Sequence, residues 1–417
     1  MQLTVVKTFI SRFLILILSF GLVIFSTNMW GSEGKGTISI VIANAAIVSF
    51  FSSIFAGSST SYFASKFKTE QILVYSYIWS VCMGILIPVI FSFADIQAKY
   101  LMYLIGISVF SALLSVNVNL FIGKQNIRLF NVYTILQQLV HILFIVFFIY
   151  ILEQKDVSVY FGAQICCLAL LFLTSFFQVI RECKISDLSL SKQVFKSMFE
   201  YGWKTQLSAF IQFLNYRLSF YFLEHFEGIG SVGIFSIGIT FSEAIWTITR
   251  SIAVILYSDV VNSKSSEESI LKTKSSLKLS FILMLIFLLG IIIIPGSVYE
   301  MIFGRAFRGT KEIMLLLSPG ILAIAISDMI GYYFSGIKEL RILNVKSIVG
   351  LVITLVFSFL LIPKYGIFGA CIVTTLSYSV SALLLFLKFY RSTEFRIQDY
   401  LITKEDIRLV KEKLIKK

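Results

Sequence analysis

The chain has little charge and few of the residues that build catalytic or metal sites. Only 14% of its 417 residues are charged, 57% are hydrophobic, and there are 2 histidines and 4 prolines. About a quarter of a soluble domain is charged, so a water-soluble fold of this length is excluded. Two histidines argue against a histidine-based metal site, and the lack of a Walker A sequence excludes ATP hydrolysis through a P-loop. We therefore expect no metal and no cofactor.

The cysteines also form no metal or redox motif. There are 5, without CxxC spacing or a histidine-rich partner, and they are Cys82, Cys166, Cys167, Cys183 and Cys371. We interpret them as polarisable packing residues. The net charge of +13 fits basic loops against an anionic membrane surface. Nucleic acid is not an expected partner.

Long apolar runs without charge fill most of the chain. Residues 36–65, 347–363 and 365–387 contain no Asp, Glu, Lys or Arg. About 20 apolar residues in a helix cross the hydrocarbon core of a bilayer, which is about 30 Å thick. The sequence therefore predicts an all-α polytopic membrane protein. We expect twelve spans, near residues 8–27, 38–58, 73–93, 99–121, 129–152, 157–180, 201–223, 230–256, 277–297, 313–335, 345–362 and 365–388.

The placement of lysine and arginine predicts the orientation of these spans. Of the 36 such residues, seven fall in odd-numbered loops: Lys35, Lys99, Lys155, Arg305, Arg308, Lys311 and Lys364. Two more, Arg217 and Arg250, fall inside spans. The rest lie at the termini, in even-numbered loops or at helix ends facing them. Because cytoplasmic loops carry the excess of positive charge, we expect both termini to be cytoplasmic.

A short polar phrase occurs twice, each time between two apolar runs. Residues 123–132 read GKQNIRLFNV and residues 336–345 read GIKELRILNV. Glycine, arginine, asparagine and valine stand at the same offsets in both. We expect the first phrase to be the turn between the fourth and fifth spans. The second then joins the tenth and eleventh spans, six spans later.

A second pair of similar segments lies at matching span numbers. GTISIVIANAAIVSF begins at Gly36 and GIFSIGITFSEAIWT begins at Gly233, so they open the second and eighth spans. An even spacing of six spans gives both halves one orientation, the parallel-repeat plan with a site between two lobes. We predict two parallel six-helix lobes around a central cavity, over residues 1–182 and 201–390. A cytoplasmic inter-lobe loop over 183–200 joins them, and a basic amphipathic cytoplasmic tail over 391–417 follows.

Three stretches resemble a known transporter family. LNYRLSFYFL and the following GSVGIFSIGITFSEAIWTITRSIAVILYSDVV, within residues 214–261, resemble the seventh and eighth spans of polysaccharide-exporting flippases. LLIPKYGIFGACIVTTLSY (360–378) and GSEGKGTISI are similar to the closing motif and an early turn of the same proteins. These are the Wzx-like branch of the multidrug/oligosaccharidyl-lipid/polysaccharide exporter superfamily. One position departs from the family, because Ser219 stands where an Asp is common, and no role of that acid is carried over.

The resemblance implies a function and a location. It implies a flippase that moves undecaprenyl-diphosphate-linked oligosaccharide from the cytoplasmic to the outer leaflet by alternating access. The product would be a surface polysaccharide, either the O-antigen of lipopolysaccharide or a capsule. The chain would then lie in the bacterial cytoplasmic (inner) membrane and would not be an enzyme. Its partners would be the lipid-linked oligosaccharide, membrane lipid, and as candidates the polysaccharide polymerase and chain-length machinery.

Four cations are candidates for binding the diphosphate. Arg217 lies in the seventh span and Arg250 in the inner half of the eighth, and a charge at such depth is costly unless it faces a polar interior. Arg12 lies one turn into the first span, where snorkelling to the interface is an equal explanation. Lys204, at the start of the seventh span, has the same two readings.

Two intramembrane acids complete the set of candidates, as ion-coupling or switch residues. Glu243 lies in the middle of the eighth span at a depth comparable to that of Arg217, so the plain alternative is a structural ion pair between neighbouring helices. Asp328 lies in the inner half of the tenth span, where a packing role competes with ion coupling. His141 in the fifth span is read as a packing residue, with a proton relay as the alternative.

Two other functions compete with the flippase. A drug/cation antiporter of the same superfamily would need an acid-lined lobe for cationic drugs, whereas two of the candidates here are arginines. An integral-membrane polysaccharide polymerase or ligase would carry a large external catalytic loop. The longest external loop expected here, residues 298–312, is short and contains no paired catalytic carboxylates.

Overall fold

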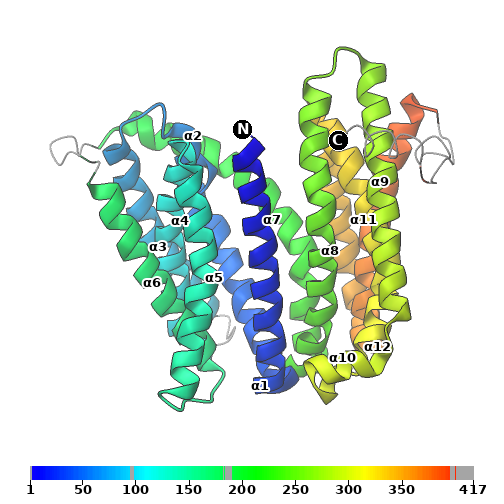
Figure 1. Ribbon diagram of the computed structural model, residues 1–417, viewed down its shortest axis with the longest axis horizontal. Coiled ribbons are helices and arrows are strands. Elements are labelled where there is room, and N and C mark those ends of the chain that lie inside the picture. Colours follow the sequence, from blue (N-terminus) through cyan, green and yellow to red (C-terminus); the bar gives the residue numbers. More distant parts are fainter. Residues whose placement is uncertain (1, 94–97, 182, 184–189, 395–399, 401–417) are drawn as a thin grey trace. The chain divides into compact units, whose positions relative to one another are not determined.

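The computed structural model describes residues 2–93, 98–181, 183, 190–394 and 400, and within them it contains helices and no strand (Figure 1). In chain order, the α-helices are α1 Gln2–Ala56, α2 Ser58–Phe63, α3 Thr69–Phe93, α4 Leu101–Gly123, α5 Ile127–Tyr150, α6 Ser158–Ile180, α7 Lys192–Glu227, α8 Ile229–Val261, α9 Ser266–Ile293, α10 Gly296–Phe303, α11 Thr310–Gly336 and α12 Leu340–Ser392. Two short 3-10 helices, η1 Ala98–Tyr100 and η3 Arg305–Phe307, precede α4 and α11. The predicted tail over 391–417 lies almost entirely outside the described residues.

The predicted all-α polytopic fold with twelve spans is confirmed. Within the described residues, nine helices are long and apolar enough to cross a membrane. Two of these, residues 14–63 and 340–392, are 50 and 53 residues long, and a single span needs only about 20. Each of them therefore supplies two spans. The nine helices therefore give eleven spans, and α7, a 36-residue helix that is not among the nine, is the twelfth.

The two long helices are each bent at one glycine. In α1 the break is at Gly31, with φ 63° and ψ −162°, and in α12 it is at Gly366, with φ 53° and ψ −128°. A positive φ is open to glycine at no steric cost and disfavours other residues. The loops that the sequence predicted between these spans are thus single-residue kinks, because one glycine is enough to redirect the chain.

The chain divides into two compact units, Met1–Phe210 and Ile211–Lys417. The division falls inside α7, which begins at Lys192 rather than at residue 201. Residues 192–200, which the sequence assigned to a loop, are helical because their apolar side chains face the first unit. Val194 and Met198, one turn apart, are buried against Ile54 and Phe55 of α1 in one hydrophobic cluster.

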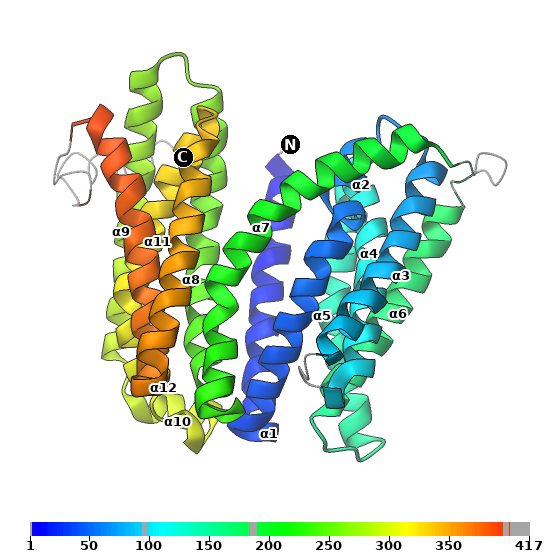
Figure 2. The same ribbon diagram turned by 180° about the vertical axis from the view of Figure 1, so that it is seen from behind.

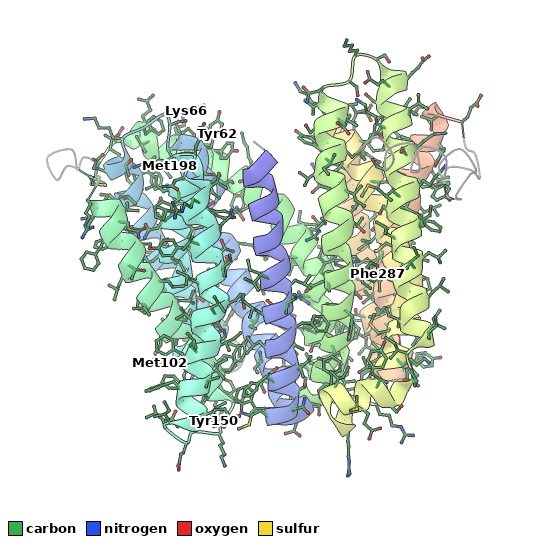
Figure 3. The ribbon with its side chains drawn as sticks, in the orientation of Figure 1. Tyr62, Lys66, Met102, Tyr150, Met198 and Phe287 are labelled. Carbon is green, nitrogen blue, oxygen red and sulfur yellow. The ribbon has the colours of Figure 1, made fainter. Side chains whose placement is uncertain are left out.

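The first unit packs α3, α4, α5 and α6 together with α1 around a continuous core. Leu114, Leu120, Phe161 and Cys167 are among its fully buried members. Successive helices run in alternating directions. Figure 3 accordingly shows Tyr62 and Lys66 at one end of this unit, and Met102 and Tyr150 at the opposite end.

The second unit is built from α8, α9, α11 and α12, which lie side by side in Figures 1 and 2, together with the second part of α7. Its core cluster contains Ala253 and Leu256 of α8, Met329 and Ile330 of α11, and Leu385 of α12. The helix pairs α11–α12, α8–α11 and α9–α11 pack over the greatest lengths within the unit. This packing brings charged side chains of three helices together, as described below.

The repeated phrase forms the same turn in both units. Gln125 and Lys338, its third residues, have φ of 60° and 64° and are among the few non-glycine residues with positive φ. The N–H groups of Asn126 and Glu339 then donate to carbonyls five residues back, of Phe121 and Phe334, at 2.7 and 2.9 Å. This is the Schellman way of ending a helix. The sequence repeat is therefore a repeat of backbone geometry.

The glycine of the phrase is required by close helix packing. A Cβ on Gly123 would lie 2.5 Å from both the Ala64 Cβ and the Ser61 carbonyl oxygen. A Cβ on Gly336 would lie 2.6 Å from the Val260 Cγ1. Helix α4 thus closes on the end of α2, and α11 closes on the end of α8, at corresponding points of the repeat.

Candidate functional site

The ion pair predicted between Arg217 and Glu243 is present in the second unit. The Arg217 Nη2 donates to the Glu243 Oε1 at 2.6 Å, from α7 to α8. The two helices are joined by a sharp turn at Gly228, whose φ is 89°. Because they form a hairpin about this turn, residues at similar distances from it lie at similar depth. A hydrogen bond between two charged groups at this distance is among the strong ones.

This pair is only partly covered by protein. The side chains of Arg217 and Glu243 keep 23% and 41% of their surface exposed, so both charges remain accessible to a ligand. The Arg217 guanidinium also lies 5.0 Å from the centre of the Phe220 ring, a cation–π distance. The ring fixes one face of the guanidinium and leaves its remaining N–H donors available to an oxyanion.

Three aromatic side chains pack beside the pair. Tyr216, Trp246 and Tyr378, from α7, α8 and α12, have ring centres 5.3 to 5.5 Å apart. The amide of Gln212 donates to the Tyr216 hydroxyl at 2.7 Å. Arg250, one turn beyond Trp246, is exposed and lies 5.9 Å from that ring. The aromatic group thus stands between Arg217 and Arg250.

A third cation lies near Asp328, and sequence reasoning missed it. Lys346 of α12 and Arg250 of α8 are both within electrostatic range of the Asp328 carboxylate on α11. Lys346 lies at the first turns of the predicted eleventh span, where it read as an interfacial lysine. A comparison of each charged residue in the spans of the second half with its counterpart in the first half would have identified Lys346, because its counterpart is neutral.

At Asn215 and Ser219 the second unit carries neutral polar residues. The Asn215 Oδ1 accepts hydrogen bonds from Thr354 and Ser377 of α12 at 2.6 and 2.8 Å, and Ser219 is buried. Asn215 and Ser219 each lie two residues from Arg217 along α7. The hydrogen bonds of Asn215 connect α7 to both arms of α12 without a carboxylate, which agrees with the departure of Ser219 from the family pattern.

The remaining candidates belong to the first unit. The side chain of Arg12 is outside the described part, and Lys204 is exposed on the part of α7 that belongs to the first unit. His141 is buried, and its Nε2 lies 3.1 Å from the Tyr160 carbonyl oxygen, which makes the packing reading the better supported one. Among the described residues, no three acidic, histidine or cysteine side chains cluster as metal ligands.

The repeat offers an internal comparison for these charges. Gly31 and Gly228, both with positive φ, are 197 positions apart, as are Gly36 and Gly233 of the second pair of similar segments; the repeated phrase is offset by 213. Applied to the charged residues, these offsets give neutral counterparts in the first unit: Phe20 for Arg217, Ala46 for Glu243, Ser53 for Arg250, Ser115 for Asp328 and Tyr133 for Lys346. The helices of the first unit therefore form without the charges.

Comparisons with known proteins agree on the fold. No protein-family model matches the chain. The solved structure of the lipid II flippase MurJ in an inward closed conformation superimposes with a TM-score of 0.75, covering 100% of this chain and 92% of that one at 14% identity. An inward-facing multidrug resistance MATE transporter of the MOP superfamily gives a TM-score of 0.72, covering 91% and 96% at 15% identity. The chain thus has the fold of MOP superfamily transporters.

Two further similarities concern the binding pocket of one matched protein and the biosynthetic role of another. A MOP superfamily transporter from Pyrococcus furiosus, described as having a binding pocket of reverse polarity that suggests a different function, gives a TM-score of 0.65 at 15% identity, covering 93% of this chain and 94% of that one. In sequence, 207 residues are 28% identical to the capsular polysaccharide biosynthesis protein CapF of Staphylococcus aureus, over 47% of this chain. The match spans about half the length of that relative, 50%.

Proposed function

We propose that the protein is a flippase that moves undecaprenyl-diphosphate-linked oligosaccharide from the cytoplasmic to the outer leaflet of the cytoplasmic membrane, for O-antigen or capsule synthesis. The observation that carries the proposal is the half-exposed Arg217–Glu243 pair on a fold shared with a lipid II flippase. The capsule-related sequence similarity supports the same substrate class. In this proposal both termini are cytoplasmic and the two lobes, 1–182 and 201–390, alternate in access.

The chemistry of the substrate explains why such cations are needed. A diphosphate cannot enter hydrocarbon unaided, because an unpaired charge there costs several kcal/mol. Arg217 offers a planar fork of donors that fits phosphate oxygens, already oriented by Phe220 and Glu243. Arg250 is a second contact in this proposal, and Arg12 and Lys204 are contacts from the first unit.

In the proposed cycle Glu243 and Asp328 are coupling residues. When the diphosphate draws Arg217 away, Glu243 loses this ion pair and can bind another cation in its place. Substrate binding at Arg217 thus changes what Glu243 contacts. A ligand whose contacts differ between two conformations shifts the equilibrium between them. Asp328 has the same role beside Lys346 and Arg250.

The competing function is a drug/cation antiporter, which the fold shared with MATE transporters favours. It needs acids that attract cationic drugs, and here each intramembrane acid of the second unit has a cation close by. The test is a deletion strain in which surface polysaccharide and lipid-linked intermediates are measured together with drug sensitivity. A flippase deletion loses surface polymer and accumulates lipid-linked repeat units. An antiporter deletion raises sensitivity to cationic drugs and leaves both glycan pools unchanged.

A further inference from the structure

A group of three charges lies in the second unit apart from the Arg217–Glu243 pair. It comprises Arg250 of α8, Asp328 of α11 and Lys346 of α12, hereafter the three-charge cluster. Two cations and one anion give it a net charge of +1 when all three are ionised. A surplus cation in an intramembrane segment is costly unless an anion binds to it.

Helix packing fixes the three side chains around one point. Gly331 of α11 lies against Leu343 of α12, since a Cβ there would be 3.6 Å from the Leu343 Cδ2. The two helices are antiparallel neighbours, so one turn further from their connecting turn Asp328 is opposite Lys346. On the other side, Ala253, one turn after Arg250, is buried in the same cluster as Met329 and Ile330, which follow Asp328.

The three charges are close but do not neutralise one another by direct contact. Asp328 is within electrostatic range of Lys346 and Arg250, yet no ion pair within 4.0 Å joins any of the three to another residue of the described part of the chain. Arg250 is exposed, and Asp328 and Lys346 are half-buried. In the Arg217–Glu243 pair, by contrast, the partners touch at 2.6 Å.

The fold itself does not require these charges. The counterparts in the first unit are Ser53, Ser115 and Tyr133, all neutral. Ser115 there satisfies its hydroxyl by donating to the Ala56 carbonyl oxygen at 3.1 Å, so the same helix junction is stable with an uncharged residue. A purely structural role for the cluster is therefore the weaker explanation.

We infer that Lys346 and Arg250 form a second oxyanion-binding subsite, and that Asp328 competes with the bound oxyanion for the two cations. The inference deepens the proposed function, because the ligand is an oxyanion of the transported molecule, either a phosphate or the carboxylate of an acidic sugar. The acid lowers the affinity for the oxyanion and thereby favours its release. Lys346 is the binding residue that this adds.

The test is binding of inorganic pyrophosphate, and in a parallel arm of glucuronate, to the purified full-length protein in detergent, measured by calorimetry. The background is Arg217→Gln, so that binding at the other pair does not mask the result. We expect Lys346→Met to weaken binding of one of the two anions about tenfold, as loss of one charged hydrogen bond does. Asp328→Asn should tighten it several-fold, and the double variant should stay weak. The anion whose affinity changes shows whether the subsite binds a phosphate or a sugar carboxylate.

Lys388→Met is the matched control. Lys388 is on the same helix, half exposed, with its Nζ 3.8 Å from the Glu339 carboxylate, and its replacement should leave anion affinity unchanged. Anion binding that is absent, or equal in all variants, would overturn the subsite. So would a loss of thermal stability in Lys346→Met that Asp328→Asn restores without any change in binding. If the subsite binds an anion while a deletion strain keeps normal glycan pools, the proposed function fails and the subsite stands.

Discussion

Replacing Arg217 separates a binding role from a structural one. Arg217→Ala removes a 2.6 Å charged hydrogen bond and a cation–π contact with Phe220. Exposed ion pairs contribute about 0.2–1 kcal/mol, and removing one partner of a fully buried pair costs about 3–5 kcal/mol. With Glu243 41% exposed, its carboxylate keeps much of its solvation. We therefore expect a loss of about 1–2 kcal/mol in stability, too little to remove the protein from the membrane.

The assay is surface glycan divided by the amount of membrane protein, for Arg217→Ala, Arg217→Lys, Glu243→Ala and the double alanine variant. If Arg217 binds diphosphate, Arg217→Ala loses most transport at a normal protein level and the double variant stays inactive. Arg217→Lys keeps the charge but not the planar fork and should retain partial transport, about tenfold reduced. Recovery of both protein level and transport in the double variant would refute the binding role, because it would mean that only the Glu243 carboxylate left without Arg217 was harmful.

Three further predictions follow from the same geometry. Cysteine labelling in intact cells should reach residues 31–37, 153–156 and 298–312 and spare 184–196, 260–275 and 400–417; external labelling of 184–196 would contradict the orientation. Glu243→Gln and Asp328→Asn should each lower surface-glycan output, and full output from both would leave no coupling role for either acid. Gly123→Ala should lower the free energy of unfolding by about 1–3 kcal/mol, because its Cβ would meet backbone. Gly336→Ala would meet the Cγ1 and Cβ of Val260, with its nearest backbone atom at 3.8 Å, and should cost less; equal melting temperatures for these two would refute this packing argument.

Some features could be predicted from the sequence because they depend on chain-local patterns. The two similar turns could be recognised because glycine, arginine, asparagine and valine recur at the same offsets in both halves. The Arg217–Glu243 pair could be predicted because two spans joined by a short turn place equal depths side by side. The second inference needs only the order and the bounds of the seventh and eighth spans.

Other features depend on tertiary packing and could not be predicted in this way. The proximity of Lys346 to Asp328 follows from the register of α11 on α12, which is set by the contact of Gly331 with Leu343. The early start of α7 was hidden because Val194 and Met198 alternate with charged and polar residues. Four apolar residues among charged and polar ones predict a loop, because the sequence does not show the surface that buries them.

The measurement that tests the central claim most directly is transport by the purified protein in liposomes. Undecaprenyl-diphosphate-linked oligosaccharide is placed in both leaflets, and the fraction that an external glycosidase can reach is followed over time. We predict that liposomes with the wild-type protein expose nearly the whole pool, whereas Arg217→Ala liposomes and protein-free liposomes expose about half, the outer leaflet alone. Equal exposure with and without the wild-type protein, in liposomes where it is shown to be folded and inserted, would contradict the flippase function.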